Sequence, residues 1–259
     1  MAGRTNLPVR LEVTAARAIA IVMCLGAASA QQSRISIDVS DARPLAAAAL
    51  ELERRLDAIV TYEDPPYEYA DDIKDVTSEV RKDGDLSKRV LVPRGGPLAF
   101  TYAMPAGRGA GAREAAVRAL ADTYNTASES ARFQVVASHP YLHIVPTMSR
   151  NAAGVLEGRR SLLDVDVSFS VGQTTLMEAV TELLRQVSAA NGVEVGVGTV
   201  PINLMLQTKT SGRAENENAR VVLQRLLAAS DRRLSWQLNR GPGQPQLCVL
   251  NVHITPRPR

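Results

Sequence analysis

Cysteine is nearly absent from this chain of 259 residues, which contains only Cys24 and Cys248. Cys24 falls in an N-terminal segment that we expect to be removed, so Cys248 has no partner for an internal disulfide. The fold must then be held together by its core alone. Cys248 lies in the apolar stretch LCVLNV, and we expect it to be a structural thiol in a buried strand.

A strong excess of charge is also absent. The chain has 30 Lys and Arg against 27 Asp and Glu. Residues 1–30 hold three of the basic residues and one of the acidic ones, so the remainder is close to neutral. This balance gives no field that would favour nucleic acid or a membrane surface. Beyond the first thirty residues no apolar run approaches transmembrane length, so no stable membrane span is expected after the leader is removed.

Recognisable catalytic and metal-binding motifs are missing as well. No G-x-S-x-G or metal-protease motif occurs. His139 and His143 are separated by Pro140 in a segment that reads as strand, so they cannot form a helical metal pair. His143 and His253 instead occupy matching positions of an internal repeat, which favours a structural role. The glycines of 105–113 lack the dinucleotide-binding spacing, and we expect a surface loop there. The sequence therefore predicts no catalytic residue, no cofactor and no metal site.

The first thirty residues have the features of a signal peptide. Arg4, Arg10 and Arg17 make a basic start, and an apolar run of about ten residues follows, too short to span a bilayer. The small residues ASA come next, as signal peptidase requires, which predicts cleavage before Gln31. We expect an exported protein, periplasmic or secreted.

Internal repetition organises the rest of the chain. Three pairs of segments match in the same order. They are ISIDV at Ile35 with VSFSV at Val167, AREAAVRALA at Ala112 with ARVVLQRLLA at Ala219, and LHIVP at Leu142 with VHITP at Val252. The spacing between partners is shorter for the last two pairs, which predicts an insertion in the first copy. The very polar residues 67–95 are the expected insertion.

Each copy is predicted to run strand, helix, strand, strand, helix, strand, strand. The expected fold is α+β, with two duplicated small modules whose mixed or antiparallel sheets carry helices on one face. The first module covers 31–147, a linker covers 148–164, and the second module covers 165–259.

The helices of the second copy have the clearest signals. Thr175 and Glu178 form a capping box, Asn191-Gly192 ends that helix, and Asn218 caps the next. Helical spacing places one apolar face of the first of these helices inward: Leu176, Met177, Val180, Leu183, Leu184 and Val187. In the first copy the pattern predicts a helix over 45–59, with Pro44 in its first turn.

These stretches resemble a known family. ISIDVSDARPLAAAALELERRLDAIVTY and VSFSVGQTTLMEAVTELLRQVSAANGVEV are similar to the short N-terminal (STN) modules of secretins and TonB-dependent transducers. Those modules open with an alternating strand, then a helix of the L-x-x-A-L-x-x-L type and a second strand. No pore or transporter barrel follows here. The resemblance implies a periplasmic α+β module that docks proteins or peptides.

The most distinctive segment is TYEDPPYEYADDIKD, 61–75, where tyrosines alternate with carboxylates around a double proline. One interpretation is a solvated loop with one or two tyrosines packed on the sheet. The other is a recognition surface, because tyrosines offer rigid amphipathic contact area. The candidate partner-binding residues are Tyr62, Asp64, Tyr67, Tyr69, Asp71 and Asp72.

The function that the sequence favours is non-catalytic: an exported binding or assembly module that acts on a protein or peptide of the cell envelope. The strand–helix–strand unit recurs without a recurring catalytic group. The alternative is an envelope hydrolase that uses carboxylates of 61–75, for example Glu63 and Asp72, since paired carboxylates can perform acid–base chemistry.

Overall fold

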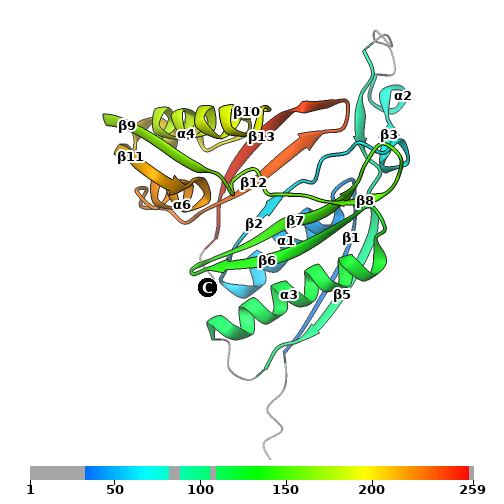
Figure 1. Cartoon of the computed structure of the whole chain (residues 1–259). Coiled ribbons are helices and arrows are strands. Elements are labelled where there is room, and N and C mark those ends of the chain that lie inside the picture. Colours follow the sequence, from blue (N-terminus) through cyan, green and yellow to red (C-terminus); the bar gives the residue numbers. More distant parts are fainter. Residues whose placement is uncertain (1–32, 82–87, 106–108, 257–259) are drawn as a thin grey trace, which may run out of the picture. The chain divides into compact units, whose positions relative to one another are not determined.

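Strands and helices alternate along the part of the chain that the computed structural model describes, residues 33–81, 88–105 and 109–256. The expected signal peptide and residues 106–108 of the glycine-rich loop lie outside these ranges. Figure 1 shows the elements. In chain order they are β1 (Arg34–Asp41), α1 (Pro44–Leu56), β2 (Ile59–Glu63), η1 (Ala70–Asp72), β3 (Ile73–Asp75), α2 (Thr77–Val80), β4 (Leu91–Pro93), β5 (Gly96–Ala103), α3 (Ala110–Ala127), β6 (Ala131–Ser138), β7 (Tyr141–Arg150), β8 (Leu156–Gly158), β9 (Asp166–Thr175), α4 (Leu176–Asn191), β10 (Glu194–Val197), α5 (Ile202–Gln207), β11 (Lys209–Asn218), α6 (Ala219–Leu227), β12 (Leu234–Gly241) and β13 (Gln244–Ile254).

The fold is α+β, as predicted, and its two halves have the same order of main elements. The first half runs β1, α1, β2, β5, α3, β6, β7, and the second runs β9, α4, β10, β11, α6, β12, β13. The pairings also correspond. β1 and β5 are antiparallel, as are β9 and β11; β2 lies parallel to β7 as β10 does to β13; β6–β7 and β12–β13 are antiparallel. Origin by duplication stays a prediction.

One central sheet runs through both halves, in the order β10-β13-β12-β2-β7-β6, with β8 paired to β7. The two halves meet where β12 lies parallel to β2, with Gln237 opposite Tyr62 and Leu238 opposite Glu63. The N–H of Asp64 extends this junction by donating to the Leu238 carbonyl at 2.8 Å. The strand β8 lies within 148–164, the segment expected to link two modules.

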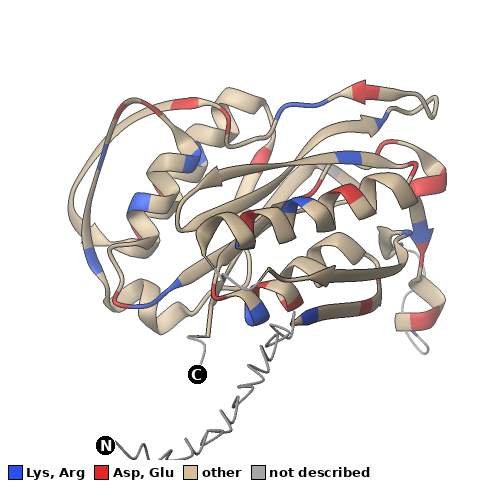
Figure 2. Cartoon of the chain, turned by 90° about the horizontal axis from the view of Figure 1, so that it is seen from below, with Lys and Arg blue, Asp and Glu red and all other residues tan. Residues whose placement is uncertain are grey.

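Each pair of helices packs against a two-stranded sheet and against part of the central sheet. In the first half α1 and α3 contribute Leu52 and Leu120, both fully buried, to a core that includes residues of β1, β5, β2, β6 and β7. In the second half Leu183 of α4 and Leu223 of α6 pack in a core with Trp236 of β12. Figure 2 shows Lys and Arg interspersed with Asp and Glu over the elements visible in that view, in keeping with the balanced charge.

The helix ends follow the sequence signals closely in the second half. Thr175 and Glu178 form the predicted capping box, Gly192 adopts a left-handed conformation at the end of α4, and the Asn218 side chain caps α6. Five of the six predicted inward residues of α4 are buried, and Met177 is partly buried. In the first half Pro44 opens α1 as expected.

The expected helix over 45–59 is too long. Asp57 takes a left-handed conformation, with φ of 53°, which ends α1 at Leu56 and turns the chain. Ile59 then begins β2. The residues Ala58-Ile59-Val60 are apolar like the buried face of the helix, which is why the predicted helix extended too far. They are buried at the start of β2 instead.

A buried chain of hydrogen bonds connects the two halves at His143 of β7. The Gln224 amide of α6 accepts from the Ser138 hydroxyl at 3.1 Å and donates to His143 Nε2 at 2.5 Å. His143 Nδ1 is thereby left as the donor, and it lies 2.6 Å from Thr61 Oγ1 of β2. Burial, and then the charge of Arg220, lower the pKa of His143 to about 3. This is the environment of a neutral structural histidine.

Candidate functional site

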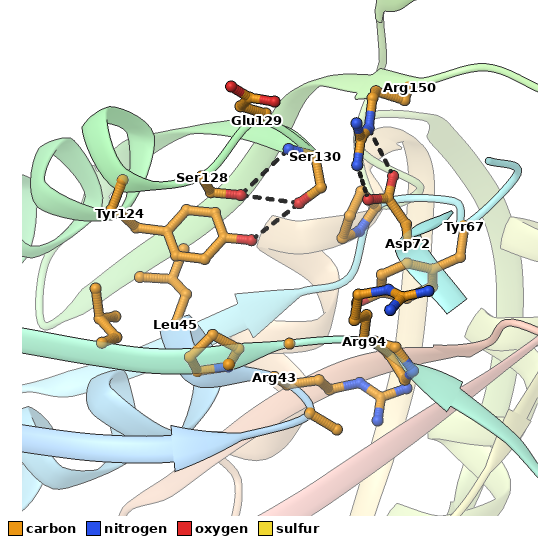
Figure 3. Close-up of a pocket in the computed structure, with 18 of the residues that line it drawn as sticks. Arg43, Leu45, Tyr67, Asp72, Arg94, Tyr124, Ser128, Glu129, Ser130 and Arg150 are labelled. Atoms are coloured by element: carbon orange, nitrogen blue, oxygen red, sulfur yellow. Dashed lines mark hydrogen bonds and ion pairs between the residues drawn. The ribbon is translucent and has the colours of Figure 1, made fainter. Parts of the chain in front are cut away.

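A cavity of about 450 Å³ lies where five separate stretches of the first half meet. They are the start of α1, the Pro65-Pro66-Tyr67 loop after β2, the turn η1, the connection from β4 to β5, and the end of α3 with the following residues. Arg150 at the end of β7 completes the wall. The volume falls within the range of small-molecule and cofactor sites. Figure 3 shows the lining residues.

The first wall is built around Asp64, whose side chain is fully buried directly after β2. One carboxylate oxygen accepts from Arg43 Nε at 2.6 Å and from the Arg240 N–H at 2.9 Å. The other accepts from the Tyr67 hydroxyl at 2.9 Å. Burial opposes the charge of Arg43, but the Asp64 carboxylate outweighs it and raises the pKa of Arg43. Asp64 is therefore a buried anchor that fixes Arg43 and Tyr67 in the cavity wall.

The second wall is built around an Arg150–Asp72 pair. Arg150 donates to both carboxylate oxygens, from Nε at 3.0 Å and from Nη2. The guanidinium also lies over the ring of Tyr69, with Cζ 4.5 Å from the ring centroid. Gly154 also lies close to that ring, and a Cβ there would approach Tyr69 to 3.0 Å. This arrangement ties η1, and with it the start of the insertion, to β7.

The third arginine of the cavity is held differently. Arg94 donates from Nε to the Asp71 carbonyl and from Nη2 to the Ile73 carbonyl at 3.4 Å. Among the residues that the structure describes, no carboxylate oxygen lies within 4.0 Å of its guanidinium. Its position depends on Gly95, which has φ of 55° and whose Cβ, if present, would lie 2.1 Å from the Asp41 carbonyl oxygen. No side chain larger than hydrogen fits that turn.

Hydroxyl groups line the opposite wall, at the end of α3. Ser128 Oγ lies 2.9 Å from Ser130 Oγ and accepts from the Ser130 N–H at 3.2 Å. The Tyr124 hydroxyl lies 3.4 Å from Ser130 Oγ. Glu129 is exposed between the two serines. Figure 3 shows this group facing Asp72, Arg94 and Arg43 across the cavity.

Neither a metal-binding cluster nor a histidine contributes to this cavity among the residues that the structure describes. Within the described ranges of the chain, no group of three or more His, Cys, Asp or Glu side chains could hold a metal ion. Neither His143 nor His253 lines the cavity; His253 Nε2 lies 3.2 Å from Glu53 Oε1, away from any serine of the wall. The Ser128 and Ser130 hydroxyls contact each other, and no histidine of the described residues lines the cavity beside them.

The two carboxylates considered for hydrolysis are each engaged in contacts with other side chains or the backbone. Glu63 is buried outside the cavity, where its oxygens accept from the Ser161 hydroxyl and from the Leu162 N–H at 2.6 Å. Burial raises the pKa of Glu63. Asp72 is occupied by Arg150. The two side chains thus serve separate contacts, and only Asp72 lines the cavity.

The structure gathers most of the sequence-predicted binding residues at this cavity. Tyr62, Tyr67, Asp71 and Asp72 line it, Asp64 lies behind its wall, and Tyr69 packs on Arg150 beside it. The segment is less solvated than the interpretation as a surface loop with one or two packed tyrosines implies. Tyr62, Asp64 and Asp72 are buried, because the chain continues the β2–β12 junction and then folds back onto β7.

Sequence reasoning missed the other half of the cavity: Arg43, Arg94, Arg150, Tyr124, Ser128 and Ser130. These residues come from separate segments, and only the tertiary fold brings them together. One usable signal was Arg94-Gly95-Gly96, an arginine before two adjacent glycines, which is typical of a tight turn.

Cys248 has the buried position expected from the sequence, and burial raises the pKa of its thiol to about 11.

In the part of the chain that the structure covers, no helix is both long and apolar enough to cross a membrane. A scan of family models, a search of curated proteins and a search of solved structures each found no match to this chain.

Proposed function

We propose that this protein is an exported, non-catalytic binding module of the cell envelope, and that it holds a segment of a protein or peptide partner in the cavity between α1, η1, β5 and the end of α3. The observation that carries the proposal is the way the cavity is built. Tyrosines, prolines and arginines line it, and two of the arginines are fixed by buried carboxylates.

Rigid walls of this kind lower the entropy cost of binding. Tyr62 and Tyr67 present ring surfaces with few rotatable bonds, and Pro65, Pro66 and Pro97 add apolar surface on a stiff backbone. The hydroxyl and guanidinium groups provide hydrogen-bond partners at the edges. Such a cavity can recognise a side chain and the adjacent main chain of a partner without any reacting group.

The export and family parts of the proposal rest on the sequence. The basic, apolar and small-residue order of 1–30 supports secretion, and sequencing the N-terminus of the protein recovered from the envelope tests it. The shared order and pairing of strands in both halves supports the resemblance to tandem STN-like modules, which dock proteins or peptides.

The test is selection of binding peptides from a displayed random library with the purified protein. Selected peptides are then measured against two tryptophan variants. Ala127→Trp places a ring in the cavity mouth without removing a hydrogen-bonding side chain, while Thr126→Trp adds the same ring one residue earlier, outside the lining. We expect Ala127→Trp to weaken binding by about tenfold or more and Thr126→Trp by less than about twofold. If the peptides bind Ala127→Trp and Thr126→Trp with equal affinity, the cavity is not the binding site.

A further inference from the structure

Three arginines line the cavity, and only one of them has no carboxylate partner. Arg43 is paired with Asp64 and Arg150 with Asp72, while Arg94 is held by main-chain carbonyls alone, among the residues that the structure describes. A paired guanidinium is already neutralised, so it offers little to a further anion. Arg94 differs because its anchors are neutral carbonyls, so within the described residues no ion pair offsets its charge.

The two carbonyl anchors also orient Arg94. They engage Nε and Nη2 and hold the guanidinium plane at the edge of the turn formed by Gly95 and Gly96. Figure 3 shows the Arg94 side chain in the cavity wall between Asp72 and Arg43. A guanidinium has five N–H groups, so donors remain beyond the two that are engaged. A planar group that is oriented in advance binds a carboxylate with less loss of entropy.

The neighbouring backbone adds to this effect. α1 begins at the cavity with Pro44 and Leu45, no side chain caps its N-terminus, and its first turn has no acidic residue. Unsatisfied N–H groups and the helix dipole favour a negative charge there. Two further carboxylates of the lining keep their charge, but neither forms an ion pair with Arg94. Asp71 accepts a hydrogen bond from the Tyr69 hydroxyl, and Glu129 lies on the opposite wall.

We infer that Arg94 is the recognition residue for a carboxylate of the bound partner segment, with the tyrosine and proline walls taking the adjacent apolar side chain. This inference rests on the proposed function. A C-terminal carboxylate and an Asp or Glu side chain share the chemistry that Arg94 recognises, and the experiment distinguishes the two.

The experiment is an NMR titration of the whole exported chain with three N-acetylated tripeptides. The first is Ala-Ala-Leu with a free C-terminus, the second is its C-terminal amide, and the third is Ala-Glu-Leu amide, which carries only a side-chain carboxylate. Inorganic phosphate serves as a fourth probe. The backbone amides of Gly95, Gly96 and Ser130 report binding at the cavity.

We expect at least one carboxylate peptide to shift these amides and to bind about tenfold more tightly than the neutral amide. Arg94→Gln should abolish that advantage, and Arg94→Lys should retain part of it. Arg89→Gln is the matched control, because Arg89 is exposed, is paired with Asp75 at 2.8 Å and lies outside the lining. Circular dichroism shows whether each variant is folded. If Arg94→Gln does not fold, the inference is tested by the acid-over-amide preference of the wild type and by its partial loss in Arg94→Lys.

Three results would overturn the inference: equal affinities for acid and amide, an unchanged preference in Arg94→Gln, or no response to any peptide. A response to phosphate alone would also overturn it, since the site would then be a general anion site. If library-selected peptides bind and are blocked by Ala127→Trp while their amides bind equally well, the proposed function stands and only the role of Arg94 fails.

Discussion

Lowering the pH should destabilise this protein through His143 before its exposed carboxylates begin to titrate. The folded-state pKa of His143 is lowered to about 3, while an unfolded histidine has the ordinary value of 6.5. Between these values the unfolded chain binds a proton that the folded protein does not. Stability is therefore complete above about pH 6.5 and is lost as the pH falls towards 3.

The size of the effect follows from the same two values. Linkage gives a loss of about 2 kcal/mol between about pH 7.5 and pH 5, and of about 4–5 kcal/mol by pH 3 as an upper limit. The carboxylates with lowered pKa, such as the exposed Glu178 and the partly exposed Glu182, have ordinary values near 4.5, so they contribute little above that pH. Glu63, whose pKa is raised by burial, takes up a proton in the folded state and acts in the opposite direction, equally in the wild type and in a His143 variant.

Urea denaturation at about pH 7.5 and pH 5 measures this loss as a difference in the free energy of unfolding. His143→Gln serves as the comparison. It removes the titrating ring and keeps groups able to contact Thr61 and Gln224. The variant should start from a lower stability but lose less than about 0.5 kcal/mol over the same interval. Equal losses in the variant and the wild type would refute the reasoning.

Three further predictions concern stability and processing. Leu183→Ala should cost about 2–5 kcal/mol in chemical denaturation, since Leu183 is fully buried, whereas Thr174→Ala should cost under about 1 kcal/mol because Thr175 is the cap. Equal costs would mean that the register of α4 is wrong. Gly95→Ala should lower the melting temperature clearly, because its Cβ would meet the Asp41 carbonyl; an unchanged melting temperature would contradict the turn geometry. N-terminal sequencing of the envelope form should begin at Gln31, and a protein that retains Met1 would contradict export.

The parts of the fold that could be predicted are those governed by local rules. The capping box at Thr175, the stop at Gly192 and the buried face of α4 follow from side-chain spacing within one helix. The same is true of the alternating strands at Ile35 and Val167. The first half has weaker helix signals, because its many alanines do not define one apolar face. Matching it against the second half predicted the order of its elements.

What could not be predicted depends on contacts distant in sequence. The parallel junction of β2 with β12 buries Glu63 and Asp64, and no local pattern indicates that two adjacent acidic residues will be buried. The partners that make this burial possible, Arg43 and Arg220, lie far away along the chain. For this reason neither interpretation of the acidic tyrosine segment included the burial of its carboxylates Glu63, Asp64 and Asp72.

The cavity shows the same division. Its tyrosine–proline side was identified because Tyr62 and Tyr67 lie in a short segment where tyrosines alternate with carboxylates around a double proline. Its arginine and serine side was not, since Arg94 and Ser130 become significant only once β5 and the end of α3 lie opposite each other. Composition alone gave no reason to select either residue.

The central claim is that the cavity beside the end of α3 holds a partner segment, and the most direct test is the structure of the protein bound to a library-selected peptide. The account predicts the peptide in this cavity, with a side chain against Tyr67 and Tyr124 and a carboxylate at Arg94. A peptide bound instead along the edge of the central sheet at β10, or on the exposed apolar residues Ile202 and Leu206 of α5, would contradict it.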